Sequence, residues 1–458
     1  MSPRSLLCLS LDRQVRDQAR RTAIHSEADR RSFTFAELGA RVEAWATALR
    51  KAGVCEGQTV AIALGNVPAF PEVFFALRSL SAAALLVDDP AVSAKMGASW
   101  IVHRGPDGTA PDGAPDREVR LTAARPETAV PSGTALIKLT SGSTLAPRGA
   151  CFSEQALIDG IDHILRGMDI TAADRVLISI PLSHGYGFDN GVLSLAAGGT
   201  PLVLQNDVLP AAQLRTLRER EITFFPAVPA FIRALGQVTW PDGLPLRRVI
   251  SASAPLSRDA AEAFTRASGR PVCQFFGSTE TGGISFENRP GEPGADGGVG
   301  FPLPGVRIEL VDGDLVRVHS SANRFAVIPE QPTAAHVDTG DRASWSAEGR
   351  LRLEGRATLV ANVGGLKVDL GALDEFFRGL PGVDDAVAVP VEDPARGHRV
   401  VAYVETTAHT GARLIEICRE KLSAREIPSE IRVVDRLPRN ARGKPDRKAL
   451  STLAGGGC

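Results

Sequence analysis

Residues 139–149 read Leu139-Thr140-Ser141-Gly142-Ser143-Thr144-Leu145-Ala146-Pro147-Arg148-Gly149, a hydroxyl- and glycine-rich stretch directly after an apolar segment. Such a segment bounded by glycine and proline predicts a buried strand that ends in a loop. Hydroxyls and free backbone amides in the loop can surround phosphate oxygens, and Arg148 can add charge-assisted hydrogen bonds. We therefore expect a triphosphate-binding loop, with an ordinary polar turn as the alternative. The loop lacks the Gly-Lys-Ser/Thr ending of a P-loop nucleotidase, which disfavours that class.

The segments around this loop alternate between helical and strand periodicity. Helices are predicted at 35–52, 69–80, 154–166 and 211–220, and strands at 59–64, 135–139, 175–180 and 223–225. Alternation of this kind predicts a parallel sheet with helices on its faces. Residues 104–125, rich in proline, glycine and aspartate, are predicted to form a loop.

The pattern changes after Phe286. Short strands at 306–311 and 315–318, among many glycines and prolines, predict a β-rich section. A small α+β unit then follows, with helices predicted at 373–378 and 413–422 and strands at 386–391 and 400–405. We place the junction near 356–360, which predicts a large domain 1–355 and a small C-terminal domain 356–458.

Size and composition exclude several classes of protein. A chain of 458 residues exceeds one ordinary core, so at least two domains are expected. The net charge of -1 does not favour nucleic acid as a partner. No apolar run approaches the roughly 18 residues that span a bilayer, and no cleavable signal is visible, which predicts a cytoplasmic protein. The six cysteines are scattered, so neither zinc nor disulfides are expected, and most should be small buried residues.

A second glycine-flanked motif follows another apolar strand. It reads Gln274-Phe275-Phe276-Gly277-Ser278-Thr279-Glu280-Thr281-Gly282-Gly283. An aromatic ring beside a glycine can stack on a flat base, Thr279 can donate to a phosphate, and Glu280 offers the hard oxygen that magnesium prefers. Taken alone, this motif is as readily an ordinary turn.

Three weaker motifs follow in order. In Asp338-Thr339-Gly340-Asp341 the second carboxylate could accept hydrogen bonds from both ribose hydroxyls. The pair Gly355-Arg356 comes next, and then Asn362-Val363-Gly364-Gly365-Leu366-Lys367-Val368. Acidic turns are common on surfaces, so it is the order of these motifs that makes them informative.

A basic loop lies near the end of the chain, Pro438-Arg439-Asn440-Ala441-Arg442-Gly443-Lys444-Pro445-Asp446-Arg447. Lysine is a small minority of the 52 basic residues, yet this arginine-rich loop places Lys444 after its glycine. A compact ammonium suits a cation that bridges two oxygens on different groups better than a planar guanidinium does. A solvated surface loop is the alternative.

Together these motifs resemble those of the adenylate-forming superfamily, which includes acyl-CoA and aryl-CoA synthetases, peptide-synthetase adenylation domains and firefly luciferase. The resemblance extends from Phe33-Thr34-Phe35-Ala36-Glu37-Leu38 to Lys444. It implies an α/β fold with a large N-terminal domain of αβαβα-type layered subdomains and a small β-barrel-like section. A small, mobile α+β C-terminal domain would carry the adenylation lysine.

The resemblance also implies roles for individual residues. The catalytic set would be Lys444, Thr279, Glu280 and His184, with Glu280 as the magnesium ligand and Lys444 contacting the carboxylate and the α-phosphate. The nucleotide would contact Thr140, Ser141, Gly142, Ser143, Thr144, Arg148, Ser253, Ala254, Phe275, Phe276, Gly277, Ser278, Thr279, Asp341, Arg356 and Lys444. The acyl pocket would consist of His184, Tyr186, Phe188, Asn190, Phe225, Ala254 and Phe275. The face for the thiol step would include Gly364, Gly365 and Lys367.

The implied reaction is ATP-dependent, AMP-forming ligation of a small carboxylic acid to a thiol. Its cofactors would be ATP, Mg²⁺ and either coenzyme A or the phosphopantetheine of a separate carrier protein. Gly185 stands where amino-acid-activating relatives have an aspartate, and Phe275 stands where aryl-acid ligases often have glycine. These residues favour a small aryl or a short to medium acyl acid.

Several residues depart from the family pattern, namely Leu145, Arg148, Thr358 and Ala372. A weakened or non-catalytic nucleotide-binding member that acts through a partner is therefore the alternative function. The presence of Lys444, Glu280 and Asp341 argues against this alternative.

Overall fold

A computed structural model describes residues 5–140, 148–288, 298–329, 335–356, 359–363, 366–393, 397–422, 426–440 and 444–455, with residues 360, 362, 366, 367 and 397 described by their backbone only. The chain divides into two compact units. Unit 1 comprises Met1–Glu309, Arg317–Val337 and Ser346–Leu351, and unit 2 comprises Leu310–Val316, Asp338–Trp345 and Arg352–Cys458.

The core of unit 1 contains two sheets built mainly from parallel strands. In the first, the neighbouring strands are β15 (Gly298–Pro302), β14 (Gly282–Phe286), β13 (Val272–Ser278), β12 (Arg248–Ser251), β11 (Phe224–Ala227), β9 (Val176–Ile178), β10 (Leu202–Leu204), β1 (Thr22–Ser26) and β2 (Arg31–Thr34). The run from β13 to β1 is parallel, while β14, β15 and β2 are antiparallel to their neighbours. Parallel strands place their carboxyl ends at one edge, where ligands of open α/β sheets bind.

The second sheet of unit 1 carries the predicted phosphate loop. Its order is β18 (Ala326–Ile328), β8 (Arg148–Phe152), β7 (Leu136–Thr140), β4 (Ala83–Leu86), β3 (Thr59–Ala63), β5 (Trp100–Arg104) and β6 (Val119–Ala123). The four central strands β7, β4, β3 and β5 are parallel. Apolar residues of these strands, such as Ile62 and Leu85, are fully buried because both sheet faces are covered.

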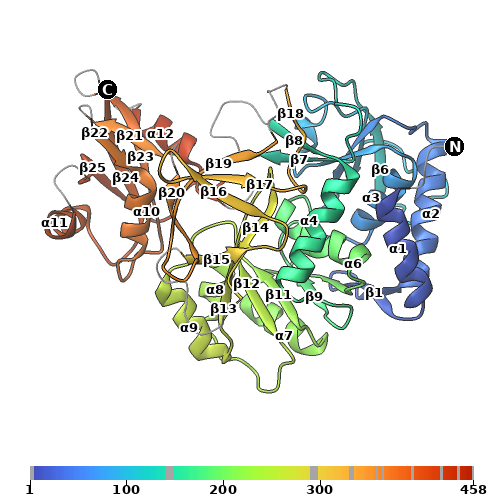
Figure 1. Cartoon of the computed structure of the whole chain (residues 1–458), viewed down its shortest axis with the longest axis horizontal. Helices are drawn as coiled ribbons and strands as arrows, with labels where there is room; N and C mark the ends of the chain where they lie inside the picture. Colours follow the sequence, from blue (N-terminus) through green and yellow to red (C-terminus); the bar gives the residue numbers. More distant parts are fainter. Residues whose placement is uncertain are drawn as a thin grey trace. The chain divides into compact units, whose positions relative to one another are not determined.

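Helices cover these sheets. They are α1 (Leu6–Asp17), α2 (Phe35–Lys51), α3 (Ala69–Ser79), α4 (Glu154–Gly167), α5 (Gly185–Phe188), α6 (Ser194–Ala197), α7 (Pro210–Glu219), α8 (Pro229–Leu235) and α9 (Arg258–Ser268), with the short turns η1 (Pro90–Val92) and η2 (Asp189–Leu193). Helix α2 starts where it does because Thr34 and Glu37 form a capping box. Helices α1, α2 and α3 pack together in the blue part of Figure 1.

Unit 2 contains a small sheet in the order β22 (Leu366–Asp369), β21 (Val360–Val363), β24 (Gly397–Glu405) and β23 (Asp385–Asp393), with β25 (Glu430–Val434) beside β24. Its helices are α10 (Leu370–Arg378), α11 (Gly411–Lys421) and α12 (Arg447–Gly455), all coloured orange to red in Figure 1. The unit boundaries fall within or at the ends of β16 (Arg307–Val311), β17 (Leu315–His319), β19 (Val337–Trp345) and β20 (Leu351–Arg356).

Most of the predicted helices and strands agree with the structure within about three residues at each end, and the mixed α/β fold class is confirmed. The prediction of a loop over 104–125 was wrong in part, because residues 119–123 form β6 antiparallel to β5. Val119 and Leu121 are buried on alternate positions, so a half-buried strand forms despite the polar composition of the segment. The boundary at 355/356 stays a prediction for the functional domains.

Cys8, Cys151, Cys273 and Cys418 are buried, as predicted for small apolar residues, whereas Cys55 is exposed and Cys458 lies outside the described residues. No helix within the described part of the chain is long and apolar enough to cross a bilayer.

Candidate active site

The turn between β13 and β14 carries the second predicted nucleotide motif. A Cβ on Gly277 would lie 2.6 Å from the carbonyl oxygen of Gly282, so only glycine allows the two strands to approach at this point. The pairing of the strands also shifts register between Phe276 and Gly277. Phe276 is buried, at 8% exposed, whereas Gly277 beside it is exposed, so the motif presents backbone at the end of the sheet.

Hydroxyl groups organise this turn. Ser278 Oγ lies 3.0 Å from Thr281 Oγ1 and accepts a hydrogen bond of 3.2 Å from the backbone N–H of Glu280. The half-buried Thr279 hydroxyl makes no hydrogen bond to any residue that the structure describes. It is therefore available as a donor to a ligand oxygen.

The carboxylate of Glu280 fits the role of a magnesium ligand. The Glu280 backbone is fixed, because its carbonyl accepts a 2.8 Å hydrogen bond from the N–H of Arg324. Its half-buried side chain has neither an ion pair nor a hydrogen bond with any described residue. No group of three or more acidic, histidine or cysteine side chains in the described ranges could hold a metal alone. One free carboxylate suits Mg²⁺, which is usually held by one or two carboxylates together with substrate phosphates.

The two ends of the predicted phosphate loop are held side by side. Thr140 ends β7 and Arg148 begins β8, and the two residues are paired in the antiparallel register. Both are half-buried. Ser141, Gly142, Ser143 and Thr144 lie outside the described residues, as does Leu145.

Two of the predicted acyl-pocket residues form an aromatic pair. The centroids of the Tyr186 and Phe275 rings are 5.8 Å apart. The Tyr186 hydroxyl donates to the carbonyl oxygens of Ala227, at 3.2 Å, or Ile250, at 3.3 Å, at the carboxyl ends of β11 and β12. Burial raises the pKa of Tyr186 well above its ordinary value, so the phenol is neutral. Tyr186 thus presents an uncharged aromatic surface together with Phe275.

Three further residues predicted for this pocket, Phe188, Asn190 and Phe225, are buried in unit 1. Phe188 is fully buried, and its ring packs edge-on against Phe70 and Phe74 of α3. Phe225 is likewise buried in the core between the first sheet and α7, α8 and α9. Asn190 donates to the carbonyl oxygen of Tyr186 at 2.9 Å, while its buried Oδ1 has no hydrogen-bond donor among the described residues. Of these three, Asn190 is the residue with unused hydrogen-bonding capacity.

His184 stands at the N-terminus of α5 and faces an acidic residue that the sequence reasoning missed. Its Nε2 is 3.4 Å from Asp88 Oδ2, and the hydroxyl of Ser183 donates to the other oxygen of Asp88. Asp88 comes two residues after β4 ends at Leu86. An acidic residue just beyond the carboxyl end of a parallel strand is the signal that could have identified it.

The segment after β12 is the remaining predicted part of unit 1. Ser251 ends the strand with a buried hydroxyl that has no partner among the residues described. Ser253 adopts a φ of 74°, and it and Ala254 are exposed. A non-glycine residue in this left-handed region signals local strain, which is common at ligand sites.

In unit 2, the predicted ribose ligand Asp341 is held by Arg356. Arg356 Nε donates to Asp341 Oδ1 at 2.8 Å, although Asp341 is only 6% exposed. The other carboxylate oxygen, Oδ2, is buried and accepts no hydrogen bond within the described part of the chain. A buried oxygen without a donor is costly, and a bound hydroxyl group would satisfy it.

Lys444 also belongs to unit 2, where its exposed side chain projects from the loop before α12. Gly364 and Gly365 lie outside the described residues. Lys367 is described by its backbone, which pairs with Asn362 in the β21–β22 hairpin.

The predicted nucleotide residues are therefore distributed over both units, with Thr140 beside Arg148 in unit 1 and Asp341 beside Arg356 in unit 2. A second feature that the sequence reasoning missed is a buried ion pair in unit 1 between Lys138 of β7 and Asp189 of η2. No local motif marks these residues, because the pairing depends on the packing of two distant segments.

Two family profiles match this chain. A family profile described as AMP-binding enzyme matches residues 11–98 and 93–322, and one described as AMP-binding enzyme C-terminal domain matches 373–444. Together the matches include the phosphate loop, the β13–β14 motif and Lys444.

Curated relatives are named ligases and synthetases. Sulfoacetate–CoA ligase of Cupriavidus necator is 30% identical over 70% of this chain and 67% of its own length. Feruloyl-CoA synthase of an Amycolatopsis species is 26% identical over 90% of this chain and 92% of its own length. Tyrocidine synthase 3 of Brevibacillus parabrevis is 27% identical over 70% of this chain, but the match spans only 5% of that much longer protein.

Solved structures share the fold. ATP-bound MatB from Rhodopseudomonas palustris superposes with a TM-score of 0.83 at 23% identity, covering 98% of this chain and 99% of that one. The o-succinylbenzoate CoA synthetase of Bacillus subtilis, in complex with ATP and magnesium, has the same TM-score and sequence identity. The superposition covers 96% of this chain and 98% of that one.

The family profiles match well over half of the chain, and the fold likeness extends over nearly all of it. These findings confirm the predicted superfamily, the fold class and the enzyme class, an AMP-forming acid–thiol ligase. The chain belongs to the AMP-binding enzyme family.

Proposed function

We propose that this enzyme uses ATP to activate a small aryl or a short to medium acyl carboxylic acid. The acid would become an acyl adenylate with release of pyrophosphate, and the acyl group would then pass to a pantetheine thiol. The thiol would belong to coenzyme A or to a separate carrier protein. The partners are therefore a small acid and, in the second case, a carrier protein.

The observation that carries this proposal is the carboxylate of Asp341. One oxygen is fixed by Arg356, and the other is buried with no donor among the described residues. The two hydroxyls of a ribose can supply the missing hydrogen bonds, since a carboxylate accepts at both oxygens. A nucleoside is thus the ligand that this carboxylate suits.

Residues of the β13–β14 turn would bind the phosphates. The free hydroxyl of Thr279 is suited to donate to the α-phosphate, and the free carboxylate of Glu280 is suited to hold Mg²⁺. When bound, Mg²⁺ would neutralise phosphate charge. Arg148, at the end of the phosphate loop, would add a second cation.

The chemistry requires no general base, because the substrate carboxylate is already anionic. Its oxygen would form a bond to the α-phosphorus as the bond from that phosphorus to the pyrophosphate oxygen breaks. Negative charge would grow at the α-phosphate, and Lys444 is proposed to stabilise it while it also contacts the acid. In the second step the thiol would attack the acyl carbonyl, and AMP would leave.

The second step would use the small domain that we place at 356–458. We propose that it rotates after adenylation, which withdraws Lys444 and presents the face around Gly364, Gly365 and Lys367 to the thiol. His184, whose Nε2 lies 3.4 Å from Asp88 Oδ2, would lie at the acid.

The class of acid rests on the aromatic pair Tyr186 and Phe275. Two neutral rings 5.8 Å apart favour an apolar acid, and a bulky ring at position 275 shortens the pocket. Gly185 provides no carboxylate that could hold an α-ammonium group, which argues against an α-amino acid. The relatives named for sulfoacetate and feruloyl substrates also act on acids of modest size.

A pyrophosphate-exchange screen across acid classes tests this proposal, followed by acceptor assays with coenzyme A and carrier proteins. Exchange that depends on a small aryl or acyl acid is the expected result. If no acid supports exchange while ATP still binds, the chain is instead a non-catalytic nucleotide-binding member of its family.

A further inference from the structure

The loop that carries Lys444 is closed by backbone hydrogen bonds. The N–H of Asn440 donates to the carbonyl oxygen of Lys444 at 2.8 Å, and the N–H of Lys444 donates back to Asn440 Oδ1 at 3.2 Å. Farther out, the N–H of Asp446 donates to the carbonyl oxygen of Pro438 at 2.7 Å. Residues 438–440 and 444–446, on the two sides of the loop, are therefore held side by side.

An arginine lies at each end of this loop. Arg439 Nη2 donates to Asp385 Oδ2 at 2.8 Å and lies 3.3 Å from Glu405 Oε2, and these two acidic residues are partners in the β23–β24 register. At the other end, Arg447 donates to the carboxylate of Asp374 and to the carbonyl oxygen of Ala388. Each end of the loop is thus fixed to the body of unit 2 by a charged side chain.

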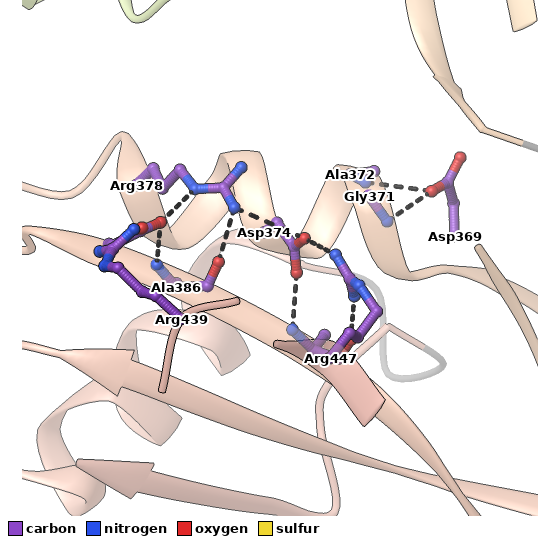
Figure 2. A network of polar contacts seen from close by, with 10 residues as sticks. Asp369, Gly371, Ala372, Asp374, Arg378, Ala386, Arg439 and Arg447 are labelled. Atoms are coloured by element: carbon purple, nitrogen blue, oxygen red, sulfur yellow. Dashed lines mark hydrogen bonds and ion pairs between the residues drawn. The ribbon is translucent and has the colours of Figure 1, made fainter. Parts of the chain in front are cut away.

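The two anchors are linked through α10. Arg378 Nε donates to Asp385 Oδ1 at 2.7 Å, and Arg378 Nη2 lies 3.7 Å from Asp374 Oδ2. Charges of alternating sign therefore run in the order Arg439, Asp385, Arg378, Asp374 and Arg447, from one end of the loop to the other. Figure 2 labels the three arginines and Asp374.

Asp374 is the buried member of this network, whereas Arg439 and Arg447 stay partly exposed. The Asp374 side chain is 3% exposed, and its Oδ1 also accepts a 2.6 Å hydrogen bond from the N–H of Ala388. Exposed ion pairs contribute little to stability, and buried pairs often contribute less than an apolar replacement would. What the network does is connect both ends of the loop to β23 and α10.

We propose that this network, the loop brace, positions Lys444 for adenylation. Arg439, Asp385, Arg378, Asp374 and Arg447 are then positioning residues that act through Lys444. The inference rests on the proposed function, because it takes Lys444 as the adenylation lysine. A displacement of about 1 Å at a reacting group can cost about 100-fold in rate, so the brace would matter without touching a substrate.

The test uses the full chain with Arg447→Met and Asp374→Asn, and Arg447→Lys as the conservative variant. Arg399→Met is the matched control, because Arg399 joins Glu430 and the carbonyl oxygen of Ala454 within the same unit but away from the loop. Adenylation is measured by pyrophosphate exchange, and the thiol step by thioester formation from supplied acyl adenylate. Amide hydrogen exchange of 438–446 reports on the loop itself.

We expect Arg447→Met and Asp374→Asn to lower adenylation at least about 10-fold and to speed amide exchange in the loop, with partial recovery in Arg447→Lys. The thiol step should change less than about 2-fold, as should both steps in Arg399→Met. In a Lys444→Ala background, Arg447→Met should cause little further loss, because residues that act through one group are not additive.

The brace is ruled out if Arg447→Met lowers adenylation by the same factor with and without Lys444. It is also ruled out if amide hydrogen exchange of the loop stays at the parent rate in Arg447→Met. An equal fall in the rates of both half-reactions would rule it out as well. Failure of the proposed function looks different, because then no acid supports pyrophosphate exchange in the parent, or Lys444→Ala leaves that exchange at the parent rate. Loop exchange still reports on the brace in that case.

Discussion

Lys138 Nζ lies 2.7 Å and 2.8 Å from the two carboxylate oxygens of Asp189, and neither side chain is more than 10% exposed. Lys138 belongs to the strand that leads into the phosphate loop, and Asp189 follows directly after α5. Burial raises the pKa of Asp189, and the Lys138 ammonium opposes this rise. The pair therefore joins the two segments that carry the predicted phosphate and acid sites.

Removal of the cation should destabilise unit 1. We expect Lys138→Met to lower the free energy of unfolding by about 3 to 5 kcal/mol, because Asp189 would stay buried without its partner. The double variant Lys138→Met/Asp189→Leu should recover a large part of this loss. Urea denaturation of the parent and both variants measures the effect. Equal instability of the single and double variants would show that packing, and not the unpaired charge, dominates.

The adenylation role of Lys444 predicts a separation of the two half-reactions. Lys444→Ala should lower pyrophosphate exchange by about 10² to 10³, the usual loss when one preorganised charge-stabilising group is removed. Thioester formation from supplied acyl adenylate should remain. Lys448→Ala is the control, since Lys448 is an exposed lysine four residues away. A similar loss in both half-reactions contradicts the assigned role.

The ribose role of Asp341 predicts weaker nucleotide binding. Asp341→Ala should reduce ATP affinity by about 1 to 3 kcal/mol, the scale of a lost hydrogen bond to a charged group. Asp338→Ala, at an exposed position of the same strand, should leave affinity near that of the parent. Calorimetry with ATP makes the comparison. An unchanged affinity in Asp341→Ala removes this carboxylate from the nucleotide site.

The position of Phe275 predicts a limit on the length of the acid. Each additional buried methylene is worth about 0.8 kcal/mol, so a pocket that excludes it discriminates a few-fold per carbon. Phe275→Gly should extend the accepted acids towards longer or para-substituted ones in pyrophosphate exchange. Because Phe275 is 7% exposed, the change also costs packing, and thermal unfolding must show a folded variant. If the folded variant keeps the length profile of the parent, Phe275 does not limit the pocket.

The folding stability of the protein is predicted to depend on pH through the carboxylate of Asp174. Its carboxylate accepts hydrogen bonds from the Thr171 N–H at 2.9 Å, the Thr223 hydroxyl at 2.8 Å and Arg247 Nη2 at 2.7 Å. Burial alone would raise the pKa of Asp174, but Arg247 and the other donors bring it below the ordinary value of 3.8. Because the pKa of Asp174 is lower in the folded state than in the unfolded state, the ionised carboxylate stabilises the fold at pH values above the unfolded-state pKa. This stabilisation is lost as the pH falls through the folded-state pKa.

Asp174→Asn should therefore be about 1 to 3 kcal/mol less stable than the parent at pH 7. The difference should shrink once the pH falls below about 4. Denaturation at a series of pH values measures it, with the exposed Asp259→Asn as the control. A difference that stays constant down to the lowest pH would show that charge on Asp174 is unimportant.

The elements that carry the site could be predicted from local patterns. The strand before Thr140 is determined by residues next to each other in the chain, so hydrophobic periodicity identifies it. Strand β6 was missed because its two buried apolar residues stand among polar ones, and antiparallel pairing with β5 stabilises it.

The missing parts of the site depend on contacts between distant segments. Lys138 and Asp189 are 51 residues apart, and Asp88 and Ser183 are 95 apart. No pattern within one segment of the sequence indicates which acidic residue will contact which lysine, serine or histidine after folding. The same holds for the loop brace, where Arg447 reaches Asp374 from 73 residues away.

The division of the chain into interleaved units has a consequence for recombination between homologous genes. Unit 2 is not one continuous stretch, since Leu310–Val316 and Asp338–Trp345 belong to it and are separated from Arg352–Cys458 by parts of unit 1. A chimera with a single crossover at 355/356 would combine strands of unit 2 from one parent with the rest of unit 2 from the other. Exchange of the two short segments together with the C-terminal part keeps each unit from a single parent, and such chimeras should fold more often.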